Sequence, residues 1–361
     1  MRLKSALRRG VAAAVIAGIV VSSGIPAYAI RWDIAEGNIT VEAGGAERTN
    51  KVTQGGTTKE DRDTVITGES KEHTVTIDTS KGDVDVTFDD LKIDVSGKKE
   101  GDGSSDGSAR ESKAAVTVQG GHDATIELDG KNELKSGSYH AGLEKNDEMS
   151  EDGETISGKL TIKDDKGKDG SLTAEGGEGG AGIGGGKEST GSSITIRGGA
   201  VKAVGGSNAA GIGDGAGRAS GDTDDPNPGD LYICGDAEVT AKAGSQTTDA
   251  KAPAIGGKYG EVPTENLSDD EHKVTGGRLT RLNADGTVME GMGYDYTSTP
   301  TPQPDDDEDD DDDVPPPAQE NAPEPLPGGM VVNGFFPAGS PSSGWTLRGL
   351  RRAASSPCSA A

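Results

Sequence analysis

The chain has 361 residues, of which 30% are hydrophobic and only 3% are aromatic, and this composition argues against a compact core of large side chains. Its formal net charge of −26 excludes nucleic acid, anionic lipid and bare anionic polymers as direct partners, because like charges repel. The 58 glycines flank short Val/Ile/Thr runs, which predicts many short strands joined by tight turns.

The first 29 residues have the order of a secretory signal peptide. Basic residues precede an apolar run at 11–21, and Ala27-Tyr28-Ala29 supplies a small-x-small cleavage pattern, so cleavage is expected between Ala29 and Ile30. A membrane anchor is the alternative, but it needs about 20 apolar residues, roughly twice the length of this run. We therefore expect a secreted chain whose mature form has no membrane span.

Residues 30–298 are expected to form the folded body. Short runs in its first half alternate apolar with polar residues, which places one side of each strand inward. Polar loops at 98–113 and 144–158 interrupt them. Only two cysteines are present, which excludes a disulfide-rich scaffold; Cys234 is expected to be a small buried apolar residue, without a bond to Cys358. The strand-like runs lie at 38–41, 63–66, 74–77, 84–88, 91–95, 115–118, 124–128 and 132–134.

A glycine-rich motif with one central isoleucine organises the second half. It reads GGAGIGGG at 179–186, AAGIGDG at 209–215 and APAIGG at 252–257, and residues 141–143 resemble an earlier copy. The first two central isoleucines are 29 residues apart and enclose two further strand-like runs. The next interval is 43 residues, because polar segments are inserted. Such insertions are typical of a solenoid, whose loops project outward from stacked coils.

These spacings predict a parallel β-helix with three short strands per coil, in which equivalent residues stack in inward ladders. A β-sandwich is the alternative, but it does not require a constant repeat. The first ladder is expected to be Leu143, Ile183, Ile212 and Ile255. The other two are expected to be Leu160/Ile162, Ile194/Ile196 and Leu231/Ile233, and Leu172/Ala174, Val201/Ala203 and Val239/Ala241.

Residues 299–361 are rich in proline and acid, with nine consecutive acidic residues at 305–313, and are expected to form a disordered tail. Leu326-Pro-Gly-Gly-Met330 has the Leu-Pro start of a wall-sorting signal but lacks the Thr-Gly that should follow. The apolar stretch 331–336 is also too short to span a membrane. The tail is therefore at most a degenerate wall-attachment region.

The motif order resembles that of the carbohydrate-binding-domain and adhesin-like proteins of Gram-positive bacterial surfaces. The resemblance covers about half of the mature chain well. It implies a right-handed parallel β-helix, similar in shape to pectate lyases, that binds polysaccharide, sometimes with calcium and usually without demonstrated catalysis. The matching residues are 134–137, 141–143, 160–162, 171–177, 180–186 and 194–203.

Two motifs bear on chemistry. Gly180-x-Gly182-x-x-Gly185 matches a dinucleotide fingerprint, but a polar segment and a strand follow it instead of a helix, so these glycines are turn residues. The acidic loop 214–230 offers hard oxygen ligands for Ca²⁺, which would bridge the acidic protein to uronic acids; a solvated loop of like charges is the alternative. The candidate calcium ligands are Asp214, Asp222, Asp224, Asp225 and Asp230.

The function expected from the sequence is that of a secreted or cell-surface polysaccharide-binding or adhesin-like protein. It is expected to be a non-catalytic monomer, either free or associated with the cell wall, whose partner is a polysaccharide or a host or cell-wall glycan. Tyr232, Arg197 and Arg218 are the candidate ligand-binding residues. Two alternatives stay open: a pectate-lyase-like enzyme, in which Arg197 or Arg218 would act as the base beside Ca²⁺, and a purely structural surface stalk.

Overall fold

The computed structural model describes residues 30–97, 112–148, 156–217, 231–246, 252–257, 260–261, 272–290 and 294–295. In these ranges the chain forms 24 strands and one short 3-10 helix, η1 (Ile34–Glu36), and all of them belong to one compact unit. The described part of the chain contains no helix that is long and apolar enough to cross a membrane. Ala29 and the tail from residue 299 onwards lie outside the described residues, so the cleavage site and the tail stay predictions.

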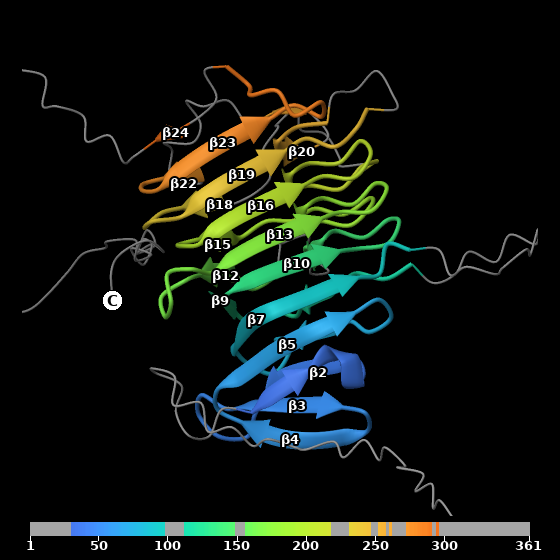
Figure 1. Cartoon of the computed structure of the whole chain (residues 1–361), viewed down its shortest axis with the longest axis vertical. Coiled ribbons are helices and arrows are strands. Elements are labelled where there is room, and N and C mark those ends of the chain that lie inside the picture. Colours follow the sequence, from blue (N-terminus) through green and yellow to red (C-terminus); the bar gives the residue numbers. More distant parts are fainter. Residues whose placement is uncertain are drawn as a thin grey trace, which may run out of the picture. The chain divides into compact units, whose positions relative to one another are not determined.

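Five successive coils, each of three strands, make up most of the body (Figure 1). Within each coil, the chain passes from a first face to a second and then to a third, and every strand pairs in parallel with its equivalent in the next coil. The coils are β8 (Val116–Gln119), β9 (Ala124–Asp129), β10 (Lys131–Lys135); β11 (Leu143–Lys145), β12 (Leu160–Lys163), β13 (Ser171–Glu175); β14 (Ile183–Gly184), β15 (Ile194–Ile196), β16 (Ala200–Val204); β17 (Ile212–Gly213), β18 (Leu231–Ile233), β19 (Glu238–Lys242); β20 (Ile255–Gly257), β22 (His272–Val274), β23 (Arg278–Leu282).

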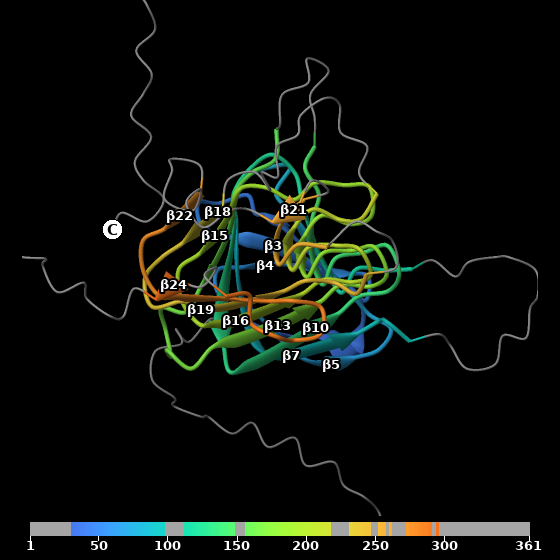
Figure 2. The ribbon, with the colours of Figure 1, turned by 90° about the horizontal axis from the view of Figure 1, so that it is seen from above.

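Seen from above, the coil winds anticlockwise towards the viewer as the chain rises from the N-terminal to the C-terminal end, so the solenoid is right-handed (Figure 2). The third-face strands lie side by side along the body in Figure 1, and the other two faces close the coil behind them. The predicted fold class, an all-β right-handed parallel β-helix with three short strands per coil, is confirmed.

Stacked ladders of aliphatic side chains fill the interior. On the first face, Leu143 pairs with Ile183, Ile183 with Ile212, and Ile212 with Ile255, and all four are at most 1% exposed. The other two faces pair their inward residues in the register that the spacing predicts. Alternating inward residues therefore bury one continuous apolar core along the solenoid axis, with about 4.8 Å between coils.

The N-terminal part of the solenoid uses longer strands that serve two faces. β7 (Val84–Asp94) pairs with β9 through residues 84–89 and with β10 through residues 92–94, and Asp90 at the bend has φ 51°. The sequence predicts two runs here, and the structure joins them into one bent strand. β6 (Val75–Asp78) pairs with β8, while β5 (Thr64–Ser70) and β1 (Arg31–Asp33) extend the sheet beyond β7.

Antiparallel strands cover the first and last coils. β2 (Ile39–Ala43) pairs with β3 (Asn50–Gln54), and β3 pairs with β4 (Thr57–Asp61). At the other end β21 (Gly260–Glu261) lies against β20, and β24 (Tyr294–Asp295) lies against β23. Such additions interrupt the flat edges through which a solenoid would otherwise pair with other chains.

Cys234 lies directly after β18 and is 4% exposed, as expected for a small buried residue. Its sulfur is disulfide-bonded, however, so the expectation that Cys234 takes no part in a disulfide bond is wrong. Cys358 lies outside the described residues.

Candidate functional site

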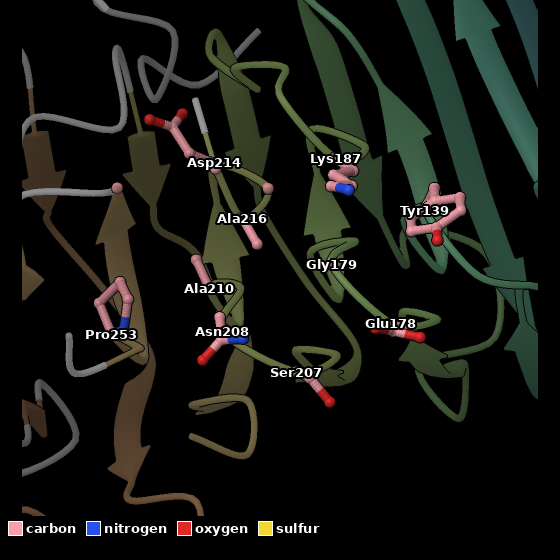
Figure 3. A pocket seen from close by; sticks show the side chains of 13 residues that line it. Tyr139, Glu178, Gly179, Lys187, Ser207, Asn208, Ala210, Asp214, Ala216 and Pro253 are labelled. Carbon is pink, nitrogen blue, oxygen red and sulfur yellow. The ribbon is translucent and has the colours of Figure 1, made fainter. Parts of the chain in front are cut away.

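A groove of about 370 Å³ runs across the turns on either side of the first-face strands (Figure 3). We call it the turn groove. Tyr139 and Lys187 lie at one end of it and Pro253 lies towards the other. Its lining is Tyr139, Glu178, Gly179, Lys187, Ser207, Asn208, Ala210, Asp214, Gly215, Ala216, Gly217, Pro253 and Gly257.

The first edge of the groove is a row of turns that precede the first-face strands. In three successive coils the residue four positions before the inward ladder residue has a left-handed backbone: Tyr139 with φ 74°, Gly179 with φ 81° and Asn208 with φ 61°. Gly and Asn adopt this conformation readily, whereas a bulky side chain disfavours it by roughly 1–2 kcal/mol. Tyr139 is therefore the unusual member of an otherwise ordinary row.

The second edge is formed by the turns that follow the same strands. Lys187 and Ala216 lie at equivalent positions of neighbouring coils. The Lys187 amide donates to the Tyr139 carbonyl at 2.8 Å, and the Ala216 amide donates to the Gly179 carbonyl at 2.8 Å. Each second-edge turn is thus hydrogen-bonded through backbone atoms to the first-edge turn of the preceding coil, which holds the two edges together.

Tyr139 and Lys187 form the most distinctive pair in the groove. The Tyr139 side chain is 49% exposed, and the Lys187 ammonium lies 4.5 Å from the centre of its ring. At an exposed site such a cation–π contact contributes about 0.5–1 kcal/mol. Gly179 packs beneath the Lys187 stem, where a Cβ atom would come within 3.2 Å of the lysine Cγ. The result is an exposed aromatic ring with a cation beside it.

A partly buried network at this end of the groove links its two edges. His140 Nδ1 lies 2.8 Å from Glu144 Oε2, which also accepts from the Ala141 amide at 3.1 Å. The other Glu144 oxygen accepts from the Asn146 amide group at 3.3 Å, and Asn146 Oδ1 accepts from the Gly186 amide at 2.8 Å. Because Gly186 directly precedes Lys187, this chain of hydrogen bonds connects the turn of Tyr139 to the turn of Lys187.

A second buried pair ties the segment after β11 to the loop after β14. The Lys145 ammonium lies 3.4 Å from Asp147 Oδ1, and both side chains are at most 5% exposed. Burial lowers the pKa of Lys145, while the charge of Asp147 opposes that shift. Asp147 Oδ1 also accepts from the Ser192 amide and hydroxyl, at 3.2 and 2.8 Å. These contacts hold the supporting loops of neighbouring coils together.

The hydrogen bond to Glu144 raises the pKa of His140, and the Glu144 charge and the Ser112 carbonyl act in the same direction, whereas burial opposes them. A raised pKa in the folded state means that the His140 contribution to stability is complete below about pH 6.5, the unfolded value. It is lost as the pH rises through the folded pKa. We therefore expect the free energy of unfolding to fall as the pH rises above about 6.5, as measured by urea titration.

His140→Gln is the control for this pH dependence, because glutamine cannot carry the proton. In that variant the fall across the same pH range should be smaller than in the wild type. Equal falls in the two proteins would show that His140 and Glu144 do not contribute to it.

The sequence-predicted site residues are not brought together. Asp214 is one of the residues that line the turn groove, but it is only 4% exposed, and its Oδ1 accepts from the Gly191 amide at 3.4 Å. Arg197 and Tyr232 lie on the outward side of the second face in neighbouring coils, where Tyr232 pairs with Thr195, and neither lines the groove. Arg218, Asp222, Asp224, Asp225 and Asp230 lie outside the described residues, so the calcium site stays a prediction.

Tyr139 and Lys187 are the groove residues that sequence reasoning missed. A search for aromatic side chains that repeat at coil spacing cannot detect one isolated tyrosine such as Tyr139. Lys187 follows the glycine motif and looks like an ordinary turn residue. The available signal was the position of Tyr139 four residues before the inward ladder residue, which it shares with Gly179 and Asn208.

The chain matches no protein-family model, no curated protein and no solved structure.

Proposed function

We propose that this chain binds carbohydrate without catalysis, as a secreted or cell-surface protein, and that the turn groove is the binding site. The observation that carries the proposal is Tyr139. A half-exposed aromatic ring occupies a left-handed turn position at which the next two coils have Gly179 and Asn208. Backbone strain of this kind is concentrated at functional sites. A glycine or an asparagine would adopt the left-handed conformation at a lower cost in stability, so the tyrosine indicates a function.

The chemistry of the groove supports carbohydrate over other ligands. An aromatic ring offers an apolar face to a pyranose, and the polar side chains of Glu178, Ser207 and Asn208 on the first edge can bond to sugar hydroxyls. Lys187 adds one cation for a carboxylate or a hydroxyl oxygen. A protein of net charge −26 disfavours nucleic acid at the same surface.

Calcium is the second part of the proposal. Asp214, the first of the predicted calcium ligands, is one of the residues that line the groove, so a cation bound through Asp214 would lie next to the groove and could bridge to uronic acids. Binding to acidic glycans would then be lost with a chelator, whereas binding to neutral glycans would persist. Equal binding to acidic glycans with and without chelator would contradict the calcium proposal alone.

Tyr139→Asn tests the proposal with little interference from folding. Asparagine is the residue that the equivalent position holds at Asn208, and it tolerates the left-handed backbone. The lost contact with Lys187, about 0.5–1 kcal/mol, is offset by the relief of strain. We expect an unchanged free energy of unfolding, within about 0.5 kcal/mol, and at least about tenfold weaker binding on a glycan array.

Tyr232→Asn is the matched control, because Tyr232 is a partly exposed tyrosine on the second face and lines no part of the groove. It should leave glycan binding unchanged. Binding that survives Tyr139→Asn but not Tyr232→Asn would move the site to the second face. A wild-type chain that binds no glycan on the array would favour the structural-stalk alternative, and unsaturated products from polygalacturonate with Ca²⁺ would favour the lyase.

A further inference from the structure

We infer that the ligand of the turn groove is an extended linear oligosaccharide of at least about three units, lying along the solenoid axis across the coils, at roughly one unit per coil spacing of about 4.8 Å. This inference rests on the proposed carbohydrate binding and goes beyond it, because it specifies the length and the direction of the ligand. A groove for a single sugar would need only the residues around Tyr139.

The length follows from where the lining residues originate. Tyr139 comes from the connection before β11. Glu178 and Lys187 come from the two turns around β14, and Ser207 and Ala216 come from the two turns around β17. Pro253 comes from the connection before β20, and Gly257 is the last residue of β20. The groove therefore crosses four consecutive coils, which is a span of roughly 14 Å at the usual strand spacing. Figure 3 shows this order from Tyr139 at one end to Pro253 at the other.

The floor of the groove favours a chain that lies flat. Between the two edges the described lining residues are small, Ala210, Gly215 and Gly257 among them, and none of these residues beyond Lys187 places a long side chain across the groove. Ser207 on the first edge bonds through its hydroxyl to Ser245 of the next coil at 3.0 Å, which continues the polar row along the same direction. An extended ligand thus meets a repeated set of polar groups, one set from each coil.

The backbone of the groove argues against an extended peptide. A peptide that adds to a sheet needs unpaired amides and carbonyls at a strand edge. Here the Ala210 amide donates to the Asp214 carbonyl at 3.1 Å, and the Ala216 and Lys187 amides donate to carbonyls of the preceding coil. These backbone groups are already paired, so recognition falls to the side chains on the two edges, which suits sugar hydroxyls.

Ala216→Gln is the variant that tests the inference. Ala216 occupies the same turn position as Lys187 one coil earlier, so the fold already accommodates a long side chain there. Glutamine at this position would extend into the middle of the groove without adding charge. The Tyr139 end would stay open to a short ligand, while a ligand that crosses the coils would be blocked.

The probe is a glycan array that carries linear oligosaccharides, neutral and uronic, each as a series from one to six units, read with Ca²⁺ present. We expect wild-type binding to rise by at least about tenfold between one and three units, and Ala216→Gln to remove that rise while leaving the signal of the shortest ligands. Equal wild-type signals for one unit and for longer chains, or longer chains unaffected by Ala216→Gln, would overturn the inference and leave the proposed function standing. Absence of any signal would overturn both.

Discussion

Ile183→Asp is expected to lower the free energy of unfolding by more than about 4 kcal/mol, or to prevent folding. Ile183 is fully buried between Leu143 and Ile212 in the first ladder. The substitution removes a large aliphatic side chain, which costs about 2–5 kcal/mol when truncated to alanine. It also places an ionised carboxylate where the neighbours above and below are aliphatic. Denaturant unfolding followed by circular dichroism measures the effect.

Ile183→Val is the matched control for this prediction. It keeps a branched aliphatic side chain at the same place in the ladder and should lower stability by only about 0.5–1.5 kcal/mol. If Ile183→Asp proved no more destabilising than Ile183→Val, the first ladder would not contribute to the stability of the fold, and the packing described above would be wrong.

Gly206→Ala is expected to cost at least about 3 kcal/mol, although it adds a single methyl group. Gly206 lies in a turn that stacks directly on Gly177 of the preceding coil, and its added Cβ atom would overlap the Gly177 carbonyl oxygen. Backbone cannot give way as a flexible side chain can. The two coils would have to separate, which weakens the bond from the Gly206 amide to the Gly180 carbonyl, 2.9 Å in the wild type.

Gly97→Ala provides the comparison, because a Cβ atom there meets nothing within 4 Å and the backbone is not left-handed. That substitution should leave stability unchanged or raise it by about 0.4–1 kcal/mol through the unfolded state. Similar losses for Gly206→Ala and Gly97→Ala in a thermal or urea melt would mean that the turn stack tolerates a side chain.

The solenoid was predictable because the sequence pattern that specifies it is local and repeats at a fixed spacing. Ile183 and Ile212 are 29 residues apart with the same flanking strands, and equal spacing leaves few architectures that stack equivalent residues. The ends were not predictable in the same way. β4 (Thr57–Asp61) has four exposed residues of five and no apolar alternation, so only its pairing with β3 makes it a strand.

The last coil shows where the repeat stops determining the core. Arg281 pairs with Ala241 and continues the inward position of Ala203 and Ala174, yet it is a fully buried arginine. Periodicity alone predicts a small apolar residue there. In the described part of the chain, β23 is followed by the antiparallel strand β24 and not by a strand of a further coil, so the ladder has no equivalent position beyond Arg281.

The candidate site was harder to foresee than the fold, because its parts come from four coils and have no common motif. Asp214 was singled out for its charge, and it is one of the residues that line the groove, but only 4% of it is exposed. Tyr139 lies beside a degenerate copy of the glycine motif, and its importance follows from a backbone angle that the sequence does not display. Residue type identifies acids and bases, but exposure and turn geometry decide which of them a ligand can reach.

The hydrogen bonds between successive turns have an evolutionary consequence. Because the amides of Lys187 and Ala216 hold the coils in place through carbonyls of the preceding turn, the position of these turns depends little on which side chains the groove edges carry. Recognition can then diverge by point mutation while the scaffold stays constant. Tandem duplication of one 29-residue unit would lengthen the solenoid by a coil and add one more row of contacts, so ligand length and scaffold length would grow together.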